Sequence, residues 1–170
     1  MVENTGSTHH PGDSNKDDIF LARAIELAKK GSTSGEGGPF GAVIVREGEI
    51  IAEAWNQVVT HRDPTAHAEI LAIRKACATV DSFHLAKTTL YASSEPCPMC
   101  LSAAYWAHID RIVFANSRSE AAAIGFCDDE IYAELSRHFS ARSILMEHHP
   151  MPESLTPLQN WVSNPKRIRY

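Results

Sequence analysis

The sequence predicts one layered α/β domain with a mixed β-sheet, and three observations support this fold class. The chain has 170 residues, a length that favours a single domain able to bury a sizeable core. A short hairpin pattern near the start is followed by alternating helix and strand patterns, which is typical of α/β proteins. No internal repeat or linker divides the sequence into separate domains.

The first element is expected to be a helix that follows a polar tail. Residues 1–15 are rich in Gly, Ser, Asn and His, so we expect a disordered tail there and a folded domain over residues 16–170. Ser14, with an acid three residues later, is typical of a helix start, and Gly31 is expected to close the helix. The apolar residues that recur between them at helical spacing are Phe20, Leu21, Ala24, Ile25 and Ala28.

The rest of the chain alternates loops, strands and helices. Four glycines and a proline in residues 35–41 predict a loop, and Glu47-Gly48 predicts the turn of a hairpin. The expected strands are residues 42–45, 50–52, 90–92, 112–115 and 144–146. The expected helices after the first are residues 66–80, 99–107, 131–137 and 157–162.

Composition and charge disfavour a nucleic-acid-binding, membrane-spanning or secreted protein. The formal net charge is −5 and no basic block precedes the last few residues, which favours a small-molecule partner over a nucleic acid. No stretch has the apolar length needed to cross a bilayer, and the start lacks the pattern of a secretory signal. We therefore expect a cytoplasmic protein, in which four cysteines indicate metal binding or chemistry rather than disulfides.

Two segments carry the residue types of a catalytic zinc site. Thr65-Ala66-His67-Ala68-Glu69 contains H-x-E, and Pro96-Cys97-Pro98-Met99-Cys100 contains P-C-x-x-C, each at the start of an expected helix. One imidazole and two thiolates provide three zinc ligands and leave a fourth position for water, as in catalytic zinc sites. Helix N-termini also favour thiolates. We expect one Zn²⁺ per chain, held by His67, Cys97 and Cys100.

Glu69 is the candidate catalytic acid and base. Zinc with two thiolates and a neutral imidazole carries no net charge, so it should acidify its bound water less than a three-histidine site does. A nearby base then becomes important, and a side chain in the first turn of a helix is able to reach the same pocket. We expect Glu69 to take a proton from the water and return it to the leaving group.

Simpler interpretations of the cysteines stay open at this point. A lone C-x-x-C is also typical of a redox pair or of half a structural zinc site. A structural site needs four protein ligands, and the sequence has no second C-x-x-C. Cys77 is a candidate fourth ligand, although its place on an apolar face favours packing in the core. Cys127 is interpreted as a free thiol, and the histidines other than His67 as surface or hydrogen-bonded residues.

Three segments resemble the cytidine deaminase superfamily and, within it, the bacterial guanine deaminases, whose zinc enzymes share H-x-E…P-C-x-x-C. The resemblance covers nearly the whole chain after the tail. It implies a three-layer α/β/α fold with a five-stranded mixed sheet, and a homodimer in which the C-terminal segment, about residues 150–170, is swapped between subunits. The segments are Gly37-Gly38-Pro39-Phe40-Gly41-Ala42-Val43-Ile44-Val45, Asp63-Pro64-Thr65-Ala66-His67-Ala68-Glu69 and Glu95-Pro96-Cys97-Pro98-Met99-Cys100.

The resemblance also implies a reaction and a set of substrate contacts. The implied reaction is hydrolysis of guanine to xanthine and ammonia by a zinc-bound hydroxide, with Glu69 as the proton shuttle. Phe40 is implied to lie against the purine face, Asn56 to hydrogen-bond the ring, and Trp106 to line the pocket. Tyr170 is implied to cap the active site of the partner subunit.

An acid after Gly125-Phe126 is implied to bind the edge of guanine. The family pattern is Gly-Phe-Asp-Asp, whereas this chain has Cys127 in place of the first acid, followed by Asp128 and Asp129. An ungapped match gives the contact to Asp128, and a slip of one residue would give it to Asp129. The departure leaves the specificity for the ring edge open.

Other functions compete with this interpretation. A tRNA adenosine deaminase shares the two motifs, but the net negative charge and the long segment after residue 144 disfavour it. A guanosine deaminase, or a deaminase of another amino-heterocycle such as a pterin or a triazine, has nearly the same motifs. From a different class, a non-catalytic zinc-stabilised binding protein would have no use for Glu69.

Overall fold

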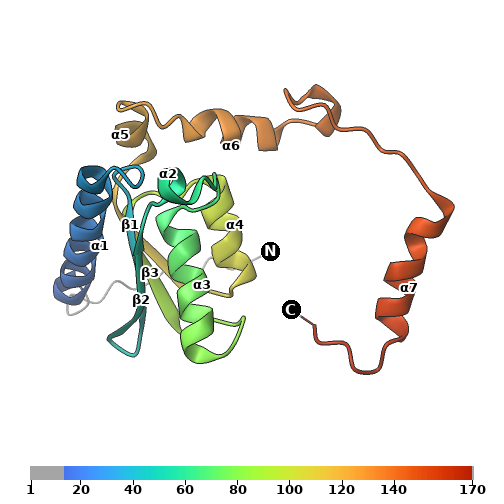
Figure 1. The fold of residues 1–170 in the computed structure, drawn as a ribbon, viewed down its shortest axis with the longest axis horizontal. Helices are drawn as coiled ribbons and strands as arrows, with labels where there is room; N and C mark the ends of the chain where they lie inside the picture. The colour runs from blue at the N-terminus through green and yellow to red at the C-terminus, as the bar shows by residue number, and fades with distance from the viewer. Residues whose placement is uncertain (1–13, 170) are drawn as a thin grey trace, which may run out of the picture.

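A computed structural model describes residues 14–169, and it consists of a mixed sheet with helices on both faces and an extended C-terminal arm (Figure 1). β1 pairs antiparallel with β2 and with β3, whereas β3 and β4 are parallel. The described residues form one sheet in the order β2-β1-β3-β4, made of β1 (Gly41–Arg46), β2 (Glu49–Trp55), β3 (Thr88–Ser94) and β4 (Arg111–Asn116). The expected mixed sheet is therefore confirmed.

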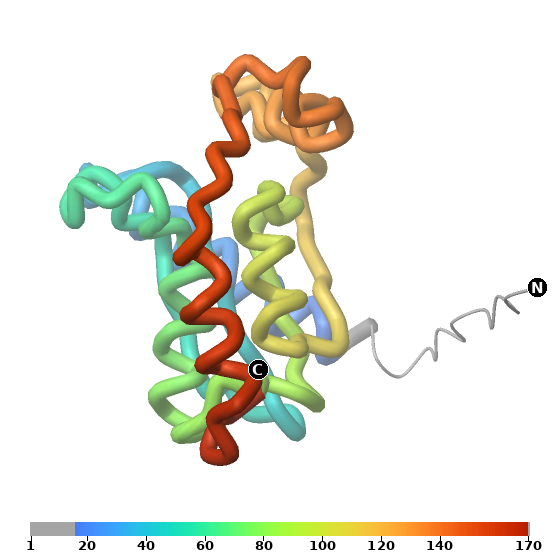
Figure 2. The backbone as a smooth tube through the Cα atoms, turned by 90° about the vertical axis from the view of Figure 1, so that its right-hand side faces the viewer, coloured from blue at the N-terminus to red at the C-terminus, as the bar shows by residue number. Residues whose placement is uncertain are grey.

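Successive residues of β1 point to opposite faces and pack against different helices. Val43 belongs to a buried cluster with α1 (Ser14–Ser34), whereas Ile44 belongs to one with α3 (Ala68–Val80). α4 (Pro98–Trp106) runs beside α3 on this second face (Figure 2). Burial of a side chain such as Ile44 stabilises the fold by about 1.5–3 kcal/mol. The α/β/α layering is confirmed.

The first helix is longer at both ends than the sequence predicts. It begins at Ser14, inside the expected tail, and continues three residues past Gly31. A Cβ atom at Gly31 would lie 2.9 Å from the carbonyl oxygen of Gly38, so this glycine allows a close approach of the loop rather than ending the helix. Gly35, at φ +71°, follows the last helical residue instead. The tail expected over residues 1–13 lies outside the described residues.

The expected fifth strand over residues 144–146 is absent from the described sheet, and the prediction of five strands is wrong for this chain taken alone. Ile144 and Leu145 are about four-fifths exposed, and they lie in an arm that leaves the domain after α6 (Asp128–Ser136). The apolar run Ile-Leu-Met suits a strand, but a strand needs an edge to pair with. In Figure 1 the chain after α6 leads away from the sheet.

The arm carries the last helix, α7 (Thr156–Ser163), close to the range that the sequence predicts. Two short 3-10 helices precede it, Phe139–Ala141 and Pro152–Leu155. Figure 1 shows α7 standing apart from the layered domain. Apolar side chains along the arm are exposed, among them Leu158, Val162 and Ile168. The arm therefore presents apolar surface that the domain of the same chain does not cover.

Two short helices were not expected from the sequence, namely α2 (Val58–His61) and α5 (Arg118–Ala122). Neither is long enough to show a helical period. α5 begins with a capping box in which Ser117 and Glu120 bond reciprocally. No helix among residues 14–169 is long and apolar enough to cross a membrane.

Candidate metal and substrate site

The side chains of His67, Cys97 and Cys100 form a compact triangle. The Cys97 and Cys100 sulfur atoms lie 3.6 and 3.5 Å from His67 Nδ1, and 3.5 Å from each other. His67 is the N-cap residue of α3, Cys97 is the N-cap residue of α4, and Cys100 lies in the first turn of α4. Because the two helices start close together on one face of the sheet, the two motifs meet at their N-termini.

The triangle fits a zinc ion. Zinc bonds of about 2.3 Å to sulfur and about 2.0–2.1 Å to nitrogen place tetrahedral ligand atoms roughly 3.5–3.8 Å apart. The three ligand atoms match this spacing, and they are the nitrogen and sulfur donors that zinc prefers. Among residues 14–169, these three side chains are the group that lies close enough together to hold a metal ion. The cluster leaves one tetrahedral position without a protein ligand.

Electrostatics in the triangle favour a thiolate. The hydrogen bond between the Cys97 and Cys100 sulfur atoms, together with the neighbouring His67, lowers the pKa of Cys97 to about 4. The hydrogen bond with Cys97 raises the pKa of His67 in turn. The pKa of Cys100 is raised, chiefly by its hydrogen bond to Cys97 and by burial. These shifts favour the thiolate form at Cys97, and a metal ion would displace the remaining protons.

Glu69 lies in the first turn of α3 and is 7 % exposed. Burial raises the pKa of its carboxyl group, and the side chain interacts with both His67 and Cys100. A buried carboxyl group with a raised pKa beside a metal site is suited to proton transfer. The placement of Glu69 beside the ligands agrees with the expected geometry.

A small hollow opens beside the triangle. It is lined by Phe40, His67, Glu69, Glu95, Cys97, Phe126 and Asp128, with a volume of about 30 Å³. The rings of Phe40 and Phe126 meet edge to face, with centroids 4.7 Å apart. Glu95 and Phe126 belong to segments quoted from the sequence, but the sequence analysis assigned neither of them a place in the site. The hollow is therefore lined by aromatic rings, by carboxyl groups and by two of the metal ligands.

The structure separates the two acids that the sequence left as alternatives. Asp128, the first residue of α6, lines the hollow, and burial raises the pKa of its carboxyl group. The Asp129 side chain is 65 % exposed and points to Arg118, with its carboxylate 3.3 Å from Nη1. Cys127, the N-cap residue of α6, is an exposed free thiol, in agreement with the prediction for it.

This geometry agrees with comparisons with known proteins. Residues 14–116 match the model of the cytidine and deoxycytidylate deaminase zinc-binding region, a span that contains all three ligands and Glu69. The chain belongs to this deaminase family. It is also 48 % identical to the guanine deaminase of Bacillus subtilis over 153 residues, which cover 90 % of this chain and 98 % of that protein.

Solved structures and a further curated relative are similar to this chain over different shares of its length. The crystal structure of the Bacillus subtilis guanine deaminase superimposes with a TM-score of 0.88 at 46 % identity, over 90 % of this chain and 98 % of that one. A guanine deaminase structure from Nitrosomonas europaea gives a TM-score of 0.62 at 28 % identity, over 75 % and 79 %. The tRNA-specific adenosine deaminase of Haemophilus influenzae is 42 % identical over 66 % of this chain and 68 % of its own length.

In this deaminase, Asn56 organises the loop beside the hollow. Its Oδ1 accepts hydrogen bonds from the backbone N–H groups of Gly38 and Val58, at 3.1 and 3.3 Å. A Cβ atom at Gly37 would lie 2.2 Å from the same oxygen, so only glycine fits there. Asn56 is buried, but it is not among the residues that line the hollow. Its expected contact with the ring stays a prediction.

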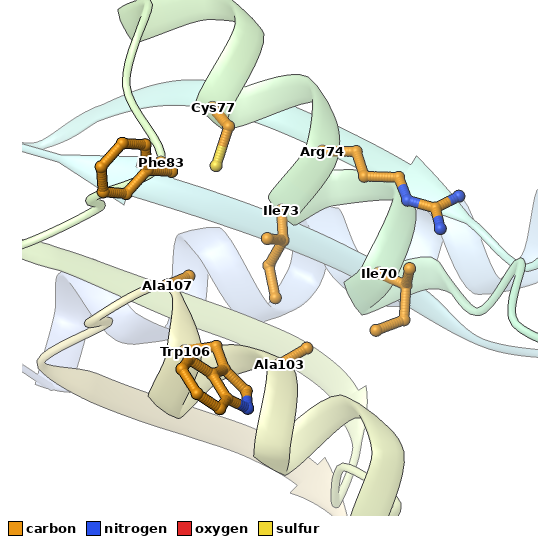
Figure 3. A pocket seen from close by; sticks show the side chains of 8 residues that line it. All are labelled: Ile70, Ile73, Arg74, Cys77, Phe83, Ala103, Trp106 and Ala107. Atoms are coloured by element: carbon orange, nitrogen blue, oxygen red, sulfur yellow. The ribbon is translucent and has the colours of Figure 1, made fainter. Parts of the chain in front are cut away.

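Trp106 lies elsewhere in the single chain. It lines an open apolar groove of about 560 Å³ between α3 and α4, together with Ile73, Phe83 and Ala103 (Figure 3). Its side chain is largely exposed, and the structure does not bring it to the hollow beside the metal ligands. Cys77 lines the same groove rather than the triangle. Tyr170 lies outside the described residues.

Proposed function

We propose that the chain is a zinc-dependent aminohydrolase that converts guanine to xanthine and ammonia. The observation that carries the proposal is the buried carboxyl group of Glu69 beside a three-ligand zinc site with one free position. A structural zinc site has four protein ligands and needs no such carboxyl group. The similarity to guanine deaminases supports the choice of substrate.

The metal ligands, Glu69, Phe40 and Asp128 each have a role in this reaction. Bound zinc supplies Lewis acidity, which makes a water molecule nucleophilic at neutral pH. Glu69 accepts a proton from that water and delivers it to the amino group, which leaves as ammonia while the ring carbon keeps the oxygen. Phe40 offers a face for a purine ring, and the Asp128 carboxylate accepts hydrogen bonds from the N–H groups of guanine.

The extent of the similarity favours a free purine over a tRNA. The similarity to the Bacillus subtilis guanine deaminase extends over 90 % of this chain, whereas that to the Haemophilus influenzae tRNA deaminase covers 66 %. The net charge of −5 disfavours a phosphate backbone as partner. Guanosine is the second candidate substrate, because its base offers the same N–H groups to Asp128.

We further propose a homodimer in which the arm is exchanged between subunits. The arm carries exposed Leu158, Val162 and Ile168, and the groove beside Trp106 is an uncovered apolar surface. Exchange of identical segments buries such surfaces without new sequence. It would also supply Tyr170 to the partner's active site and bring Trp106 into an enclosed pocket. A cytoplasmic location fits this proposal, since free ligand thiols persist in a reducing compartment.

Charging the apolar face of the arm is expected to separate the subunits. Leu158→Lys places a charge on exposed apolar surface of α7, and we expect light scattering to change from the mass of two chains to that of one. Removal of residues 166–170 is expected to impair turnover more than folding. Gln159→Lys, a neighbouring change on α7, should alter neither the mass measured by light scattering nor the turnover. A monomeric unmodified protein would rule out the exchanged dimer.

The proposed reaction is tested by ammonia release from the zinc-loaded protein. The substrates are guanine, guanosine, adenine, cytosine, cytidine and a tRNA anticodon stem, each at the same concentration. We expect guanine to give the highest rate and xanthine to be the product. Release from guanosine or tRNA alone would keep the zinc chemistry but refute the assigned substrate. No release from any of the six would refute the proposed activity and favour a pterin, a triazine or a non-catalytic binding role.

A further inference from the structure

α6 carries Asp128 into the hollow, yet few contacts attach it to the domain. None of its residues is fully buried, and most of its surface faces solvent. The Tyr132 hydroxyl donates a hydrogen bond of 3.0 Å to the carbonyl oxygen of Pro96, which precedes the ligand Cys97. The first turn of α6 and the loop of the zinc ligands are therefore neighbours, but this hydrogen bond alone does not fix the orientation of the helix.

Arg118, on α5, sits where these segments meet. Its Nε lies 3.0 Å from Glu95 Oε1, and its Nη1 lies 3.3 Å from Asp129 Oδ1. Its guanidinium group stacks over the ring of Tyr132, 4.3 Å from the centroid. Its backbone N–H donates a hydrogen bond of 3.1 Å to Glu95 Oε2. Arg118 thus contacts the loop before the zinc ligands and two residues, Asp129 and Tyr132, on one face of α6.

The orientation of the guanidinium group shows which contacts it serves. Nε of Arg118 is buried and close to Glu95, but it is not in line for a hydrogen bond with the carboxylate. The guanidinium plane faces Tyr132 instead, and its outer nitrogen faces Asp129. Arginine has a planar guanidinium group that stacks on an aromatic ring while its outer nitrogens form an ion pair, whereas lysine has only a compact ammonium group. Asp128 stands directly before Asp129 in the chain, so these contacts set its position.

We propose that Arg118 is a positioning residue that holds α6 against the Glu95–Cys97 loop and thereby fixes the Asp128 carboxylate over the substrate. The inference rests on the proposed deaminase function. Arg118 acts through Asp128 and touches neither substrate nor metal. A displacement of a substrate-binding group by about 1 Å reduces an enzyme's rate by roughly 10²-fold, so the loss of this contact has a measurable effect.

A double-mutant cycle tests this role. We expect Arg118→Ala and Asp128→Asn each to lower kcat/KM for guanine, the former by about 10²-fold. If Arg118 acts through Asp128, the double variant should lie within about threefold of Asp128→Asn alone. Arg118→Lys should be intermediate, because it keeps the charge but loses the planar stack. Losses that multiply, or unchanged kinetics in Arg118→Ala, would overturn the proposal.

Hydrogen exchange tests the same contact without the reaction. In Arg118→Ala, the amides of residues 132–136 should exchange at least about tenfold faster, while those of α3 stay protected. Arg46→Ala serves as the control, because it removes an arginine at the far end of β1 and should change neither exchange in α6 nor kinetics. If Arg118→Ala does not fold, Arg118→Lys decides both measurements. Faster exchange in Arg118→Ala, combined with a wild-type protein that does not deaminate guanine, would refute the deaminase function alone. Unchanged exchange in Arg118→Ala would refute the positioning role of Arg118.

Discussion

Glu69→Gln is expected to lower kcat by at least ~10²-fold, the low end for loss of general acid–base catalysis. The glutamine amide fits the space of the buried carboxyl group but does not accept a proton from water or return it to the amine. The three ligands are unchanged, so one zinc per chain should remain. The measurement is ammonia release from guanine under saturating substrate, with zinc determined by elemental analysis on the same sample.

Two comparisons make the Glu69 result specific. Glu49→Gln removes an exposed carboxylate from the β1–β2 hairpin and should leave turnover unchanged. The melting temperature of Glu69→Gln should not fall, since burial of this carboxyl group favours its neutral form and glutamine is neutral. A Glu69→Gln protein that turns over guanine at the normal rate with full zinc would remove Glu69 from the mechanism.

The second large effect is expected from Cys100→Ala. Cys100 is fully buried and its sulfur lies 3.5 Å from both other ligand atoms, so no other described side chain replaces it. We expect zinc affinity to weaken by at least ~100-fold, more than the loss of an outer-shell partner causes, and turnover to be lost with the metal. Zinc content after dialysis against a competing chelator is the measurement.

A cysteine outside the site provides the control for this change. Cys127→Ala removes an exposed thiol that neither binds the ligand triangle nor lines the hollow, so zinc content and turnover should be unchanged. Its normal behaviour would show that loss of a thiol as such does not remove the metal. Full zinc occupancy in Cys100→Ala would contradict the three-ligand site and would require another donor.

The sequence predicted most of the local structure of the domain, because its signals are local. The short β-rich run over residues 42–45 and the P-C-x-x-C segment depend on neighbours in the chain, and both appeared where expected. The predicted helix end at Gly31 was wrong because a glycine is needed there for the close approach of Gly38, and no local sequence pattern records that contact. The strand over residues 144–146 failed for a similar reason, since strand formation depends on a pairing edge.

The site was predictable to the extent that its chemistry is written in short motifs. His67, Cys97 and Cys100 have a spacing that few other functions need, and the structure brings all three together. The lining by Phe126 was not predictable, since a phenylalanine after glycine carries no chemical signature of its own. The surroundings of Trp106 depend on what covers the α3–α4 groove, and a single sequence does not show how a second chain would pack there.

The helix ends at the metal site show how function competes with stability. His67 and Cys97 both occupy N-cap positions, yet neither side chain makes a capping hydrogen bond. Ser, Thr, Asp or Asn at such a position stabilises a protein by about 0.5–2 kcal/mol over a residue that does not cap. Selection for catalysis has therefore kept two helix starts weaker than the backbone allows. A capping residue at either position would strengthen its helix start and remove a zinc ligand in doing so.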